Sequence, residues 1–197
     1  MRNGLRLLAC ILPVMGAWSP ELLSQERKPT DEWLTRPVDD RTFRTYLEFF
    51  VYDKSTPFEP VLFDSTQEEG MRIEHLSFTS TSGTRVFAKY YQPVGSGLQT
   101  GRVAIVLHGG TPRGKDSPYI RVLAERLVRG AMAVMAIDMQ YFGERSTELF
   151  TSFAEEEKHE RLYNQPSTYL SWVTQTVKDV GRTFDFLVDE KNIDPKK

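Results

Sequence analysis

Cysteine and histidine are scarce in this chain of 197 residues. Cys10 is the single cysteine, which excludes an intrachain disulfide and a zinc site built from cysteines. The three histidines lie far apart in the sequence and show none of the short spacings, such as H-E-x-x-H, that are typical of metal sites. We therefore expect neither a metal site nor a cofactor.

An excess of charge of either sign is also absent. The chain has 25 Lys and Arg against 27 Asp and Glu, a formal net charge of −2. Without a basic surplus, no nucleic-acid partner is expected. The 40% hydrophobic and 26% charged residues are typical of a globular protein and exclude a wholly disordered or collagen-like chain. The length favours one domain with a sizeable core.

An apolar run long enough for a membrane helix is missing as well. Arg2 and Arg6 precede an almost wholly apolar stretch, residues 7–18, which is shorter than the ~20 residues that span a bilayer. A short basic region followed by about 7–15 apolar residues is typical of a secretory signal peptide. We predict that residues 1–24 are a signal peptide, that the protein is exported to the periplasm or secreted, and that it has no stable membrane insertion after cleavage.

Residues 25–69 are expected to form an N-terminal arm followed by a helix. The segment 25–40 is polar, and apolar side chains then recur at i, i+3, i+4 and i+7, the spacing of one helical face. We expect this face to pack on the body of the domain. It consists of Phe43, Tyr46, Leu47 and Phe50.

The remainder, residues 70–197, alternates between strand and helix patterns. Two β-rich segments, 72–80 and 84–92, are separated by a tight turn and predict an antiparallel hairpin. Two further segments, 102–107 and 131–137, are apolar on both faces. Such runs are typical of strands in the middle of a sheet that helices cover.

A helix is expected between the two buried strands. Ser117 followed by Pro118 is an N-cap with proline at the first helical position, and Gly130 stands where a C-cap glycine belongs. Strand, helix and strand in about 35 residues predict a βαβ unit with parallel strands. A second, longer helix is expected to begin at Pro166.

The loop after the first buried strand, residues 108–117, is where we expect chemistry. Attack on an ester carbonyl develops negative charge on its oxygen, which backbone N–H groups can stabilise. Glycine lets the main chain approach a substrate closely. We predict that Gly109, Gly110 and Thr111 donate these N–H groups. His108 is expected to orient the loop through hydrogen bonds rather than to act as a base.

The same loop also matches a phosphate-binding motif. The residues from Gly109 to Lys115 fit G-x-x-x-x-G-K, and the strand before Asp138 resembles the acidic strand that helps to hold Mg²⁺. Asp116, however, replaces the Ser or Thr that should bind the metal, and Pro112 lacks one of the N–H groups that should hold the phosphates. A P-loop-like nucleotide-binding protein is therefore an alternative interpretation.

Four pieces of the sequence follow one another in order: a hairpin at 73–92, VAIVLHGG at 103–110, VMAIDMQYFGERS at 134–146 and DVGRTFDFLVDEKNIDPKK at 179–197. In this order they resemble the first half of an α/β-hydrolase of the dienelactone hydrolase and acetyl xylan esterase-like group. The resemblance covers roughly two thirds of the chain. It implies a three-layer α/β fold whose sheet is mostly parallel, with an N-terminal antiparallel hairpin.

The resemblance also implies an activity. The chain would belong to a serine hydrolase that cleaves carboxylic esters of small molecules or carbohydrates through an acyl-enzyme. Tyr141 and Phe142 would line the acyl pocket, because loops at the carboxyl ends of the strands surround the site in such sheets. Asp138 and His108 would have structural roles there, and residues 147–165 would form a lid.

One part of the family's pattern is missing. The family carries its nucleophile on a Gly-x-Ser-x-Gly elbow, followed by the acid and the histidine, and these 197 residues contain no such elbow. We therefore assign no catalytic residue here and expect the triad downstream of Lys197. The chain would then be an N-terminal portion, truncated before the nucleophile strand and inactive alone. A non-catalytic, hydrolase-like binding module is a third interpretation, and the oligomeric state is left open.

Overall fold

The computed structural model describes residues 36–81, 83–95, 101–194 and 196. The predicted signal peptide, residues 1–24, lies outside the described residues. The chain divides into two compact units, Met1–Asp40 and Arg41–Lys197. The described residues of the first unit are exposed. The second unit contains the sheet and its helices and is described below.

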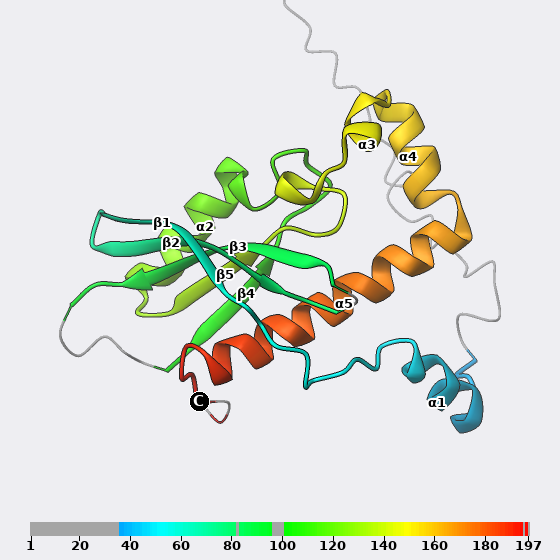
Figure 1. Cartoon of the computed structure of the whole chain (residues 1–197), viewed down its shortest axis with the longest axis horizontal. Coiled ribbons are helices and arrows are strands. Elements are labelled where there is room, and N and C mark those ends of the chain that lie inside the picture. The colour runs from blue at the N-terminus through cyan, green and yellow to red at the C-terminus, as the bar shows by residue number, and fades with distance from the viewer. Residues whose placement is uncertain (1–35, 82, 96–100, 195, 197) are drawn as a thin grey trace, which may run out of the picture. The chain divides into compact units, whose positions relative to one another are not determined.

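The sheet begins with three antiparallel strands, β1 (Val61–Glu68), β2 (Met71–Thr79) and β3 (Arg85–Pro93) (Figure 1). The pairing of β2 with β3 confirms the predicted hairpin, with Ile73 opposite Tyr91. A turn that includes Gly83, whose φ is +73°, joins the two strands.

β1 lies in the segment that the sequence predicts to be only an arm and a helix. All eight of its residues are exposed, so no alternation of buried and exposed side chains marks it as a strand. Its pairing with β2 forms it instead, through a turn at Glu69 and Gly70, which have φ of 49° and 76°. Tight turns with positive φ suit the twist of paired strands.

The second half of the sheet is a βαβ unit, as predicted. β4 (Val103–Leu107) leads into α2 (Pro118–Arg129), which is followed by β5 (Ala133–Ile137). β5 pairs in parallel with β4 and antiparallel with β3, so the strand order is β1-β2-β3-β5-β4. The α/β fold class is confirmed. Among the strands that the structure describes, the antiparallel part is larger than expected because β1 extends the hairpin.

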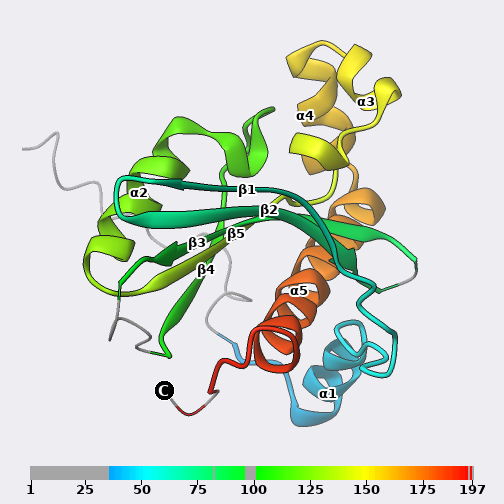
Figure 2. The same cartoon turned by 60° about the vertical axis from the view of Figure 1, so that its left-hand side comes forward.

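Helices cover both faces of the sheet, as the three-layer prediction requires (Figure 2). One face packs on α2, through a cluster that includes Ile73, Ile120 and Val134. The other face packs on α5 (Pro166–Asp189), through a cluster that includes Phe78 and Phe186. Successive residues of β5 alternate between these two clusters, because side chains of a strand point to opposite faces.

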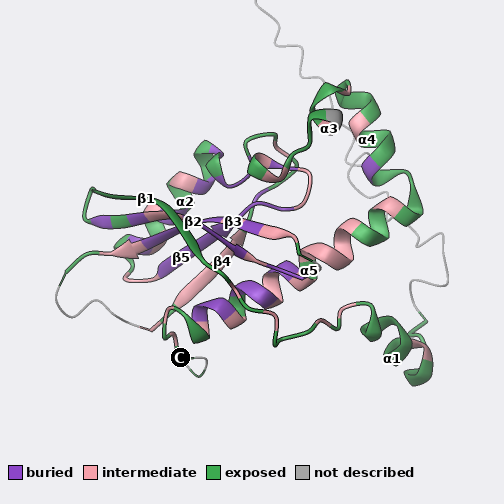
Figure 3. Cartoon of the chain, viewed as in Figure 1, coloured by how far each residue is buried: buried purple, intermediate pink, exposed green. Residues whose placement is uncertain are grey.

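Burial is uneven along α5 (Figure 3). Its buried residues, from Asp179 to Leu187, all lie in the C-terminal half, which packs on the sheet. The N-terminal half extends beyond it and meets α4 (Glu155–Tyr163). None of the helices in the described part of the chain is both long and apolar enough to cross a membrane.

The helix expected near residue 43 is present as α1 (Asp40–Glu48), but its expected packing on the domain is wrong. None of its residues is buried. Phe43, Tyr46 and Leu47 are about half exposed, and Figure 3 shows the helix as almost wholly exposed. The apolar spacing predicted the helix correctly because periodicity reports local structure, not which partner covers a face.

Candidate active site

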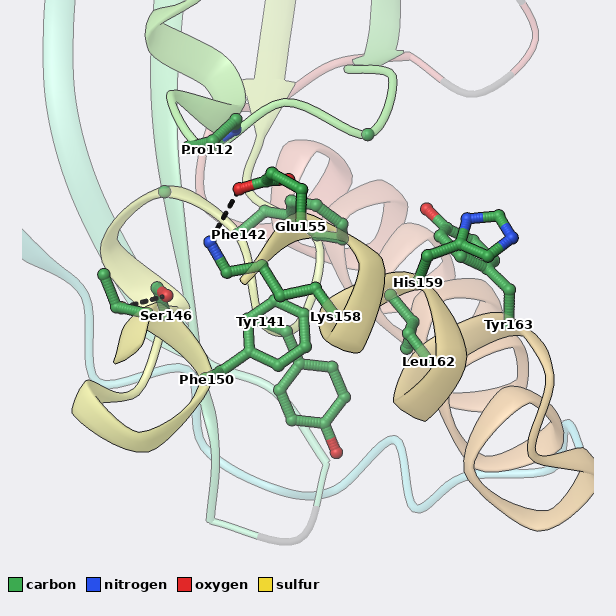
Figure 4. Close-up of a pocket in the computed structure, with 13 residues that line it drawn as sticks. Pro112, Tyr141, Phe142, Ser146, Phe150, Glu155, Lys158, His159, Leu162 and Tyr163 are labelled. Carbon is green, nitrogen blue, oxygen red and sulfur yellow. Dashed lines mark hydrogen bonds and ion pairs between the residues drawn. The ribbon is translucent and has the colours of Figure 1, made fainter. Parts of the chain in front are cut away.

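A pocket of about 490 Å³ opens at the carboxyl ends of β4 and β5 (Figure 4). Gly110 and Pro112, from the loop after β4, form one wall. Tyr141 and Phe142, from the loop after β5, form a second wall. The remaining walls come from the 3₁₀ turn η4 (Gly143–Arg145) with the residue after it, α3 (Glu148–Ser152) and α4. The fold therefore brings three of the predicted site residues, Gly110, Tyr141 and Phe142, to one cavity.

The three predicted N–H donors differ in availability. The Gly109 N–H donates to the Tyr119 hydroxyl, and the Thr111 N–H donates to the Gly109 carbonyl at 2.7 Å. Neither residue lines the pocket. The Gly110 N–H has no hydrogen-bond acceptor among the described residues, and Gly110 is exposed. Of the three predicted donors, Gly109 and Thr111 thus already have acceptors within the fold, and the Gly110 N–H has none among the described residues.

His108 connects the two loops that border the pocket. Its Nε2 accepts the Met139 N–H at 3.1 Å, and its Nδ1 faces the Gly109 carbonyl at 2.5 Å, which places the proton on Nδ1. Burial lowers the pKa of His108 below its ordinary value of 6.5. The imidazole is therefore neutral near pH 7, and both nitrogens are occupied. Through these two contacts His108 joins the loop after β4 to the loop after β5.

Asp138 occupies the junction between the same two loops and has no exposed surface. Its carboxylate accepts the backbone N–H of Lys115 at 2.7 Å and that of Glu144 at 3.1 Å. Gly114 and Gly143 border this carboxylate with φ of 53° and 56°, and a Cβ on either glycine would overlap it. Glycine is therefore required at both positions, because the Asp138 carboxylate leaves no room for a Cβ and because the backbone φ is positive.

Lys115 is enclosed by carboxylates. Its ammonium lies 3.1 Å from Asp138 and 2.9 Å from Asp116, and it also pairs with Glu144. Burial alone would lower the pKa of Lys115, but these carboxylates raise it above its usual range. The lysine that the P-loop interpretation needs for phosphates is therefore buried in a network within the protein. Within the described ranges, no three side chains of the His, Cys, Asp and Glu types gather as a metal site would require.

Two aromatic walls of the pocket, Tyr141 and Phe142, pack on rings from α3 and α5. Tyr141, with φ of 74°, stacks on Phe150 of α3 with 5.4 Å between ring centroids. Phe142 is buried. It meets the Phe150 ring edge-on, with 6.3 Å between ring centroids, and the Trp172 ring at a tilt, with 6.4 Å. These contacts connect the β5 loop to the segment that the sequence predicts to be a lid.

Tyr163, at the end of α4, is a site residue that the sequence reading missed. Its hydroxyl would lie 3.1 Å from a Cβ built on Gly110, so the phenol borders the candidate donor. Burial raises the pKa of Tyr163, which keeps the hydroxyl protonated and able to donate. The available signal was weak: Leu162 and Tyr163 are apolar residues that follow a run of charges.

Known proteins that resemble this chain were found by structure and not by sequence. No family model and no curated protein matches the chain. Its structure is similar to acetyl xylan esterase 1 from Thermoanaerobacterium sp. JW/SL YS485, with a TM-score of 0.55 and 18% identity, over 78% of this chain and 47% of that one. The chain has an acetyl xylan esterase-like α/β fold.

The structure is also similar to a second acetyl xylan esterase, from Paenibacillus sp. R4. Its TM-score is 0.50 at 18% identity, over 75% of this chain and 46% of that one. The chain therefore spans a little under half the length of these two esterases. Independently of these comparisons, the pocket lies where α/β sheets bind ligands, at the carboxyl ends of the parallel strands β4 and β5.

Proposed function

We propose that the chain is the N-terminal portion of an exported serine hydrolase that cleaves carboxylic esters. The observation that carries this proposal is the Gly110 N–H, which has no acceptor among the described residues and borders the pocket. A free backbone donor at this place in an acetyl xylan esterase-like fold is suited to a developing oxyanion. The fold and the partial coverage of the solved esterases support the same proposal.

In this proposal the chain stabilises the charge that develops on the ester oxygen and forms the pocket for the acyl group. The Gly110 N–H would stabilise the charge on the ester oxygen, and a strong donor of this kind contributes about 3–4 kcal/mol. His108 and Asp138 would hold the loop so that this N–H is already oriented before reaction. Tyr141 and Phe142 would line the pocket for the acyl group.

The nucleophile is proposed to lie downstream of Lys197. A serine there would attack the ester carbonyl, form an acyl-enzyme and release the alcohol, and water would then hydrolyse the acyl-enzyme. No cofactor takes part in this chemistry. The basic and apolar start of the chain supports export through a signal peptide at residues 1–24.

The P-loop alternative is less well supported, because the Lys115 ammonium is engaged by three carboxylates rather than directed at a ligand. The binding-module alternative has one observation in its favour: these 197 residues contain no Gly-x-Ser-x-Gly elbow. In that case the aromatic pocket would bind a ligand without turning it over.

The test compares two proteins: the 197-residue chain, and the product of the same reading frame continued past the codon for Lys197. We expect the longer product to hydrolyse p-nitrophenyl esters and a fluorophosphonate to label one of its added serines, while the 197 residues show no turnover. Labelling of a serine within residues 1–197 would overturn the placement of the nucleophile. A longer product that binds esters without hydrolysing them would favour the binding module.

A further inference from the structure

The pocket is much larger than an acetyl group requires. An acetyl group has three non-hydrogen atoms and occupies on the order of two water volumes, ~60 Å³. The cavity that borders Gly110 measures about 490 Å³, which lies in the range of pockets for drug-sized ligands. A two-carbon acyl group bound at Gly110 would leave most of this space unfilled.

Four aromatic side chains line the cavity: Tyr141, Phe142, Phe150 and Tyr163. Phe142 and Phe150 meet edge-on, and Tyr141 stacks on Phe150 (Figure 4). The Tyr163 hydroxyl borders Gly110. Aromatic side chains prefer other rings in offset-stacked or edge-to-face arrangements. A planar ring can contact several of these aromatic side chains at once. A flexible alkyl chain would lose its rotational freedom on binding.

The charged groups in the walls compensate each other. Lys158 lies 2.8 Å from Glu155, and Figure 4 shows this pair at the cavity. The Ser146 and Thr151 hydroxyls are likewise paired with each other at 2.9 Å. The Lys158–Glu155 pair therefore presents no uncompensated charge to a ligand. The other basic side chain among the described lining residues, His159, packs on the Tyr163 ring with 4.9 Å between ring centroids. These walls are suited to a neutral group.

We infer that this pocket binds a neutral aryl group on the acyl side of the ester, placed so that the carbonyl oxygen meets the Gly110 N–H. The inference rests on the proposed esterase function and adds to it a substrate class, arylalkanoyl or cinnamoyl esters. The acyl group is thus larger than the acetyl group named by the similar solved esterases.

The first experiment measures binding to the full 197-residue chain by calorimetry, with methyl cinnamate, methyl hexanoate and methyl acetate as probes. We expect methyl cinnamate to bind at least tenfold more tightly than methyl hexanoate, and methyl acetate to show no measurable binding. Equal or tighter binding of methyl hexanoate would overturn the preference for a ring. No binding of any of the three esters would overturn the site itself.

Variants locate the bound ring. Phe150→Ala removes an aromatic wall and is expected to weaken methyl cinnamate binding at least fivefold. Phe153→Ala is the matched control, since Phe153 packs on Phe150 with 6.3 Å between centroids but does not line the cavity. The affinity of the Phe153→Ala variant for methyl cinnamate should stay within twofold of that of the unmodified chain.

A second variant fills the cavity without removing any core side chain. Thr151 lines the pocket and is exposed, so Thr151→Trp places a large ring there. The change gives up only exposed hydrogen bonds, those of the Thr151 hydroxyl with Ser146 and with the Thr147 carbonyl. It is expected to weaken methyl cinnamate binding at least fivefold. Unchanged affinity in both Phe150→Ala and Thr151→Trp would place the ligand elsewhere and overturn the inference.

The failure of this inference and that of the proposed function are distinguishable. If the chain binds methyl cinnamate and the longer product hydrolyses no ester, the aryl site stands and the hydrolase proposal fails. If the longer product hydrolyses p-nitrophenyl acetate and the chain does not bind methyl cinnamate, the hydrolase proposal stands and the aryl inference is overturned.

Discussion

The Asp138 carboxylate has no exposed surface, and hydrogen-bond donors of the protein take the place of water around it. Two backbone N–H groups and the Lys115 ammonium point at its two oxygens. An unpaired buried charge would cost several kcal/mol, so the three donors and the carboxylate require one another. The position of Gly110 depends on this junction, since Lys115 and Gly114 belong to the same loop.

We therefore expect Asp138→Asn to lower the free energy of unfolding by about 3–5 kcal/mol, the range for breaking a buried ion pair. The amide keeps one acceptor oxygen but turns an NH₂ group toward donors. Urea denaturation followed by circular dichroism measures this. Glu156→Gln, at an exposed position, should change stability by no more than about 0.5 kcal/mol. A loss below about 1 kcal/mol for Asp138→Asn would contradict the account.

His108 predicts a pH dependence of stability. Its Nε2 accepts the Met139 N–H and can do so only while the ring is neutral. Burial lowers the pKa of His108 in the folded state, so the unfolded chain takes up the proton more readily. The contribution to stability is complete above the ordinary value of 6.5 and is lost as the pH falls through the lower folded-state pKa.

His108→Gln separates this group from the other titrating residues, because glutamine keeps a donor and an acceptor but does not titrate in this range. The measurement is the free energy of unfolding of both proteins from about pH 7.5 to about pH 5. The unmodified chain should be the more stable at the upper end, and its advantage should shrink toward the lower end. A constant difference would show that His108 does not titrate as described.

At the scale of elements, the segment before β1 is held on α5 by polar and aromatic contacts. The Tyr52 hydroxyl donates to Asp185 at 2.8 Å, and Gly181 leaves room for the Tyr52 ring. Arg182, which has no exposed surface, donates to the Thr56 carbonyl at 2.7 Å and lies 4.0 Å from the centre of the Phe58 ring. These contacts join residues more than 120 positions apart.

Gly181→Ala sets two effects against each other. Alanine is favoured over glycine in a helix interior by about 1 kcal/mol, but a Cβ at Gly181 would lie 2.7 Å from atoms of the Tyr52 side chain. Overpacking typically costs about 1–3 kcal/mol. Overpacking should win, and we expect the free energy of unfolding to fall by about 1–2 kcal/mol.

A double-mutant cycle checks the cause. In a Tyr52→Ala background the obstructing ring is gone, so Gly181→Ala should raise the free energy of unfolding by up to about 1 kcal/mol. This reversal of sign, measured by chemical denaturation, is the expected result. The same loss in both backgrounds would mean that the Tyr52 ring is not what opposes the Cβ.

At the scale of the molecule, the sheet ends on one side at β4, whose sequence is apolar on both faces. Ile105 packs against the α5-side cluster and Val106 against the α2-side cluster, while Leu107 is 40% exposed. An edge strand presents unpaired backbone groups that can pair with another chain. In the described part of the molecule, β4 has β5 as its neighbour on one side only.

We expect the purified 197-residue chain to self-associate through this edge. Leu107→Lys places a charge on the edge strand and should reduce the rise of average mass with concentration in sedimentation or light scattering. Val122→Lys is the matched control: Val122 is 46% exposed but stands on α2, which offers no strand edge. Equal effects of the two changes would point to general surface apolarity rather than to the edge.

Local patterns in the sequence determined much of the fold. The runs at β4 and β5, the cap at Ser117 with Pro118 and the glycine at 130 predict the βαβ unit, because strand and helix periods and cap chemistry act over a few residues. The three-layer arrangement follows from strands that are apolar on both faces. For the same reason, Gly110, Tyr141 and Phe142 could be assigned to one end of the sheet.

Only the tertiary structure decided which groups are free and which surfaces are covered. The Gly109 N–H is occupied by Tyr119, ten positions on, and the wall beside Gly110 comes from Tyr163, so neither follows from spacing in the loop. β1 exists through its pairing with β2, and the apolar face of α1 stays exposed. Hydrogen-bond partners and burial depend on which distant segments pack together, and a local pattern does not carry that information.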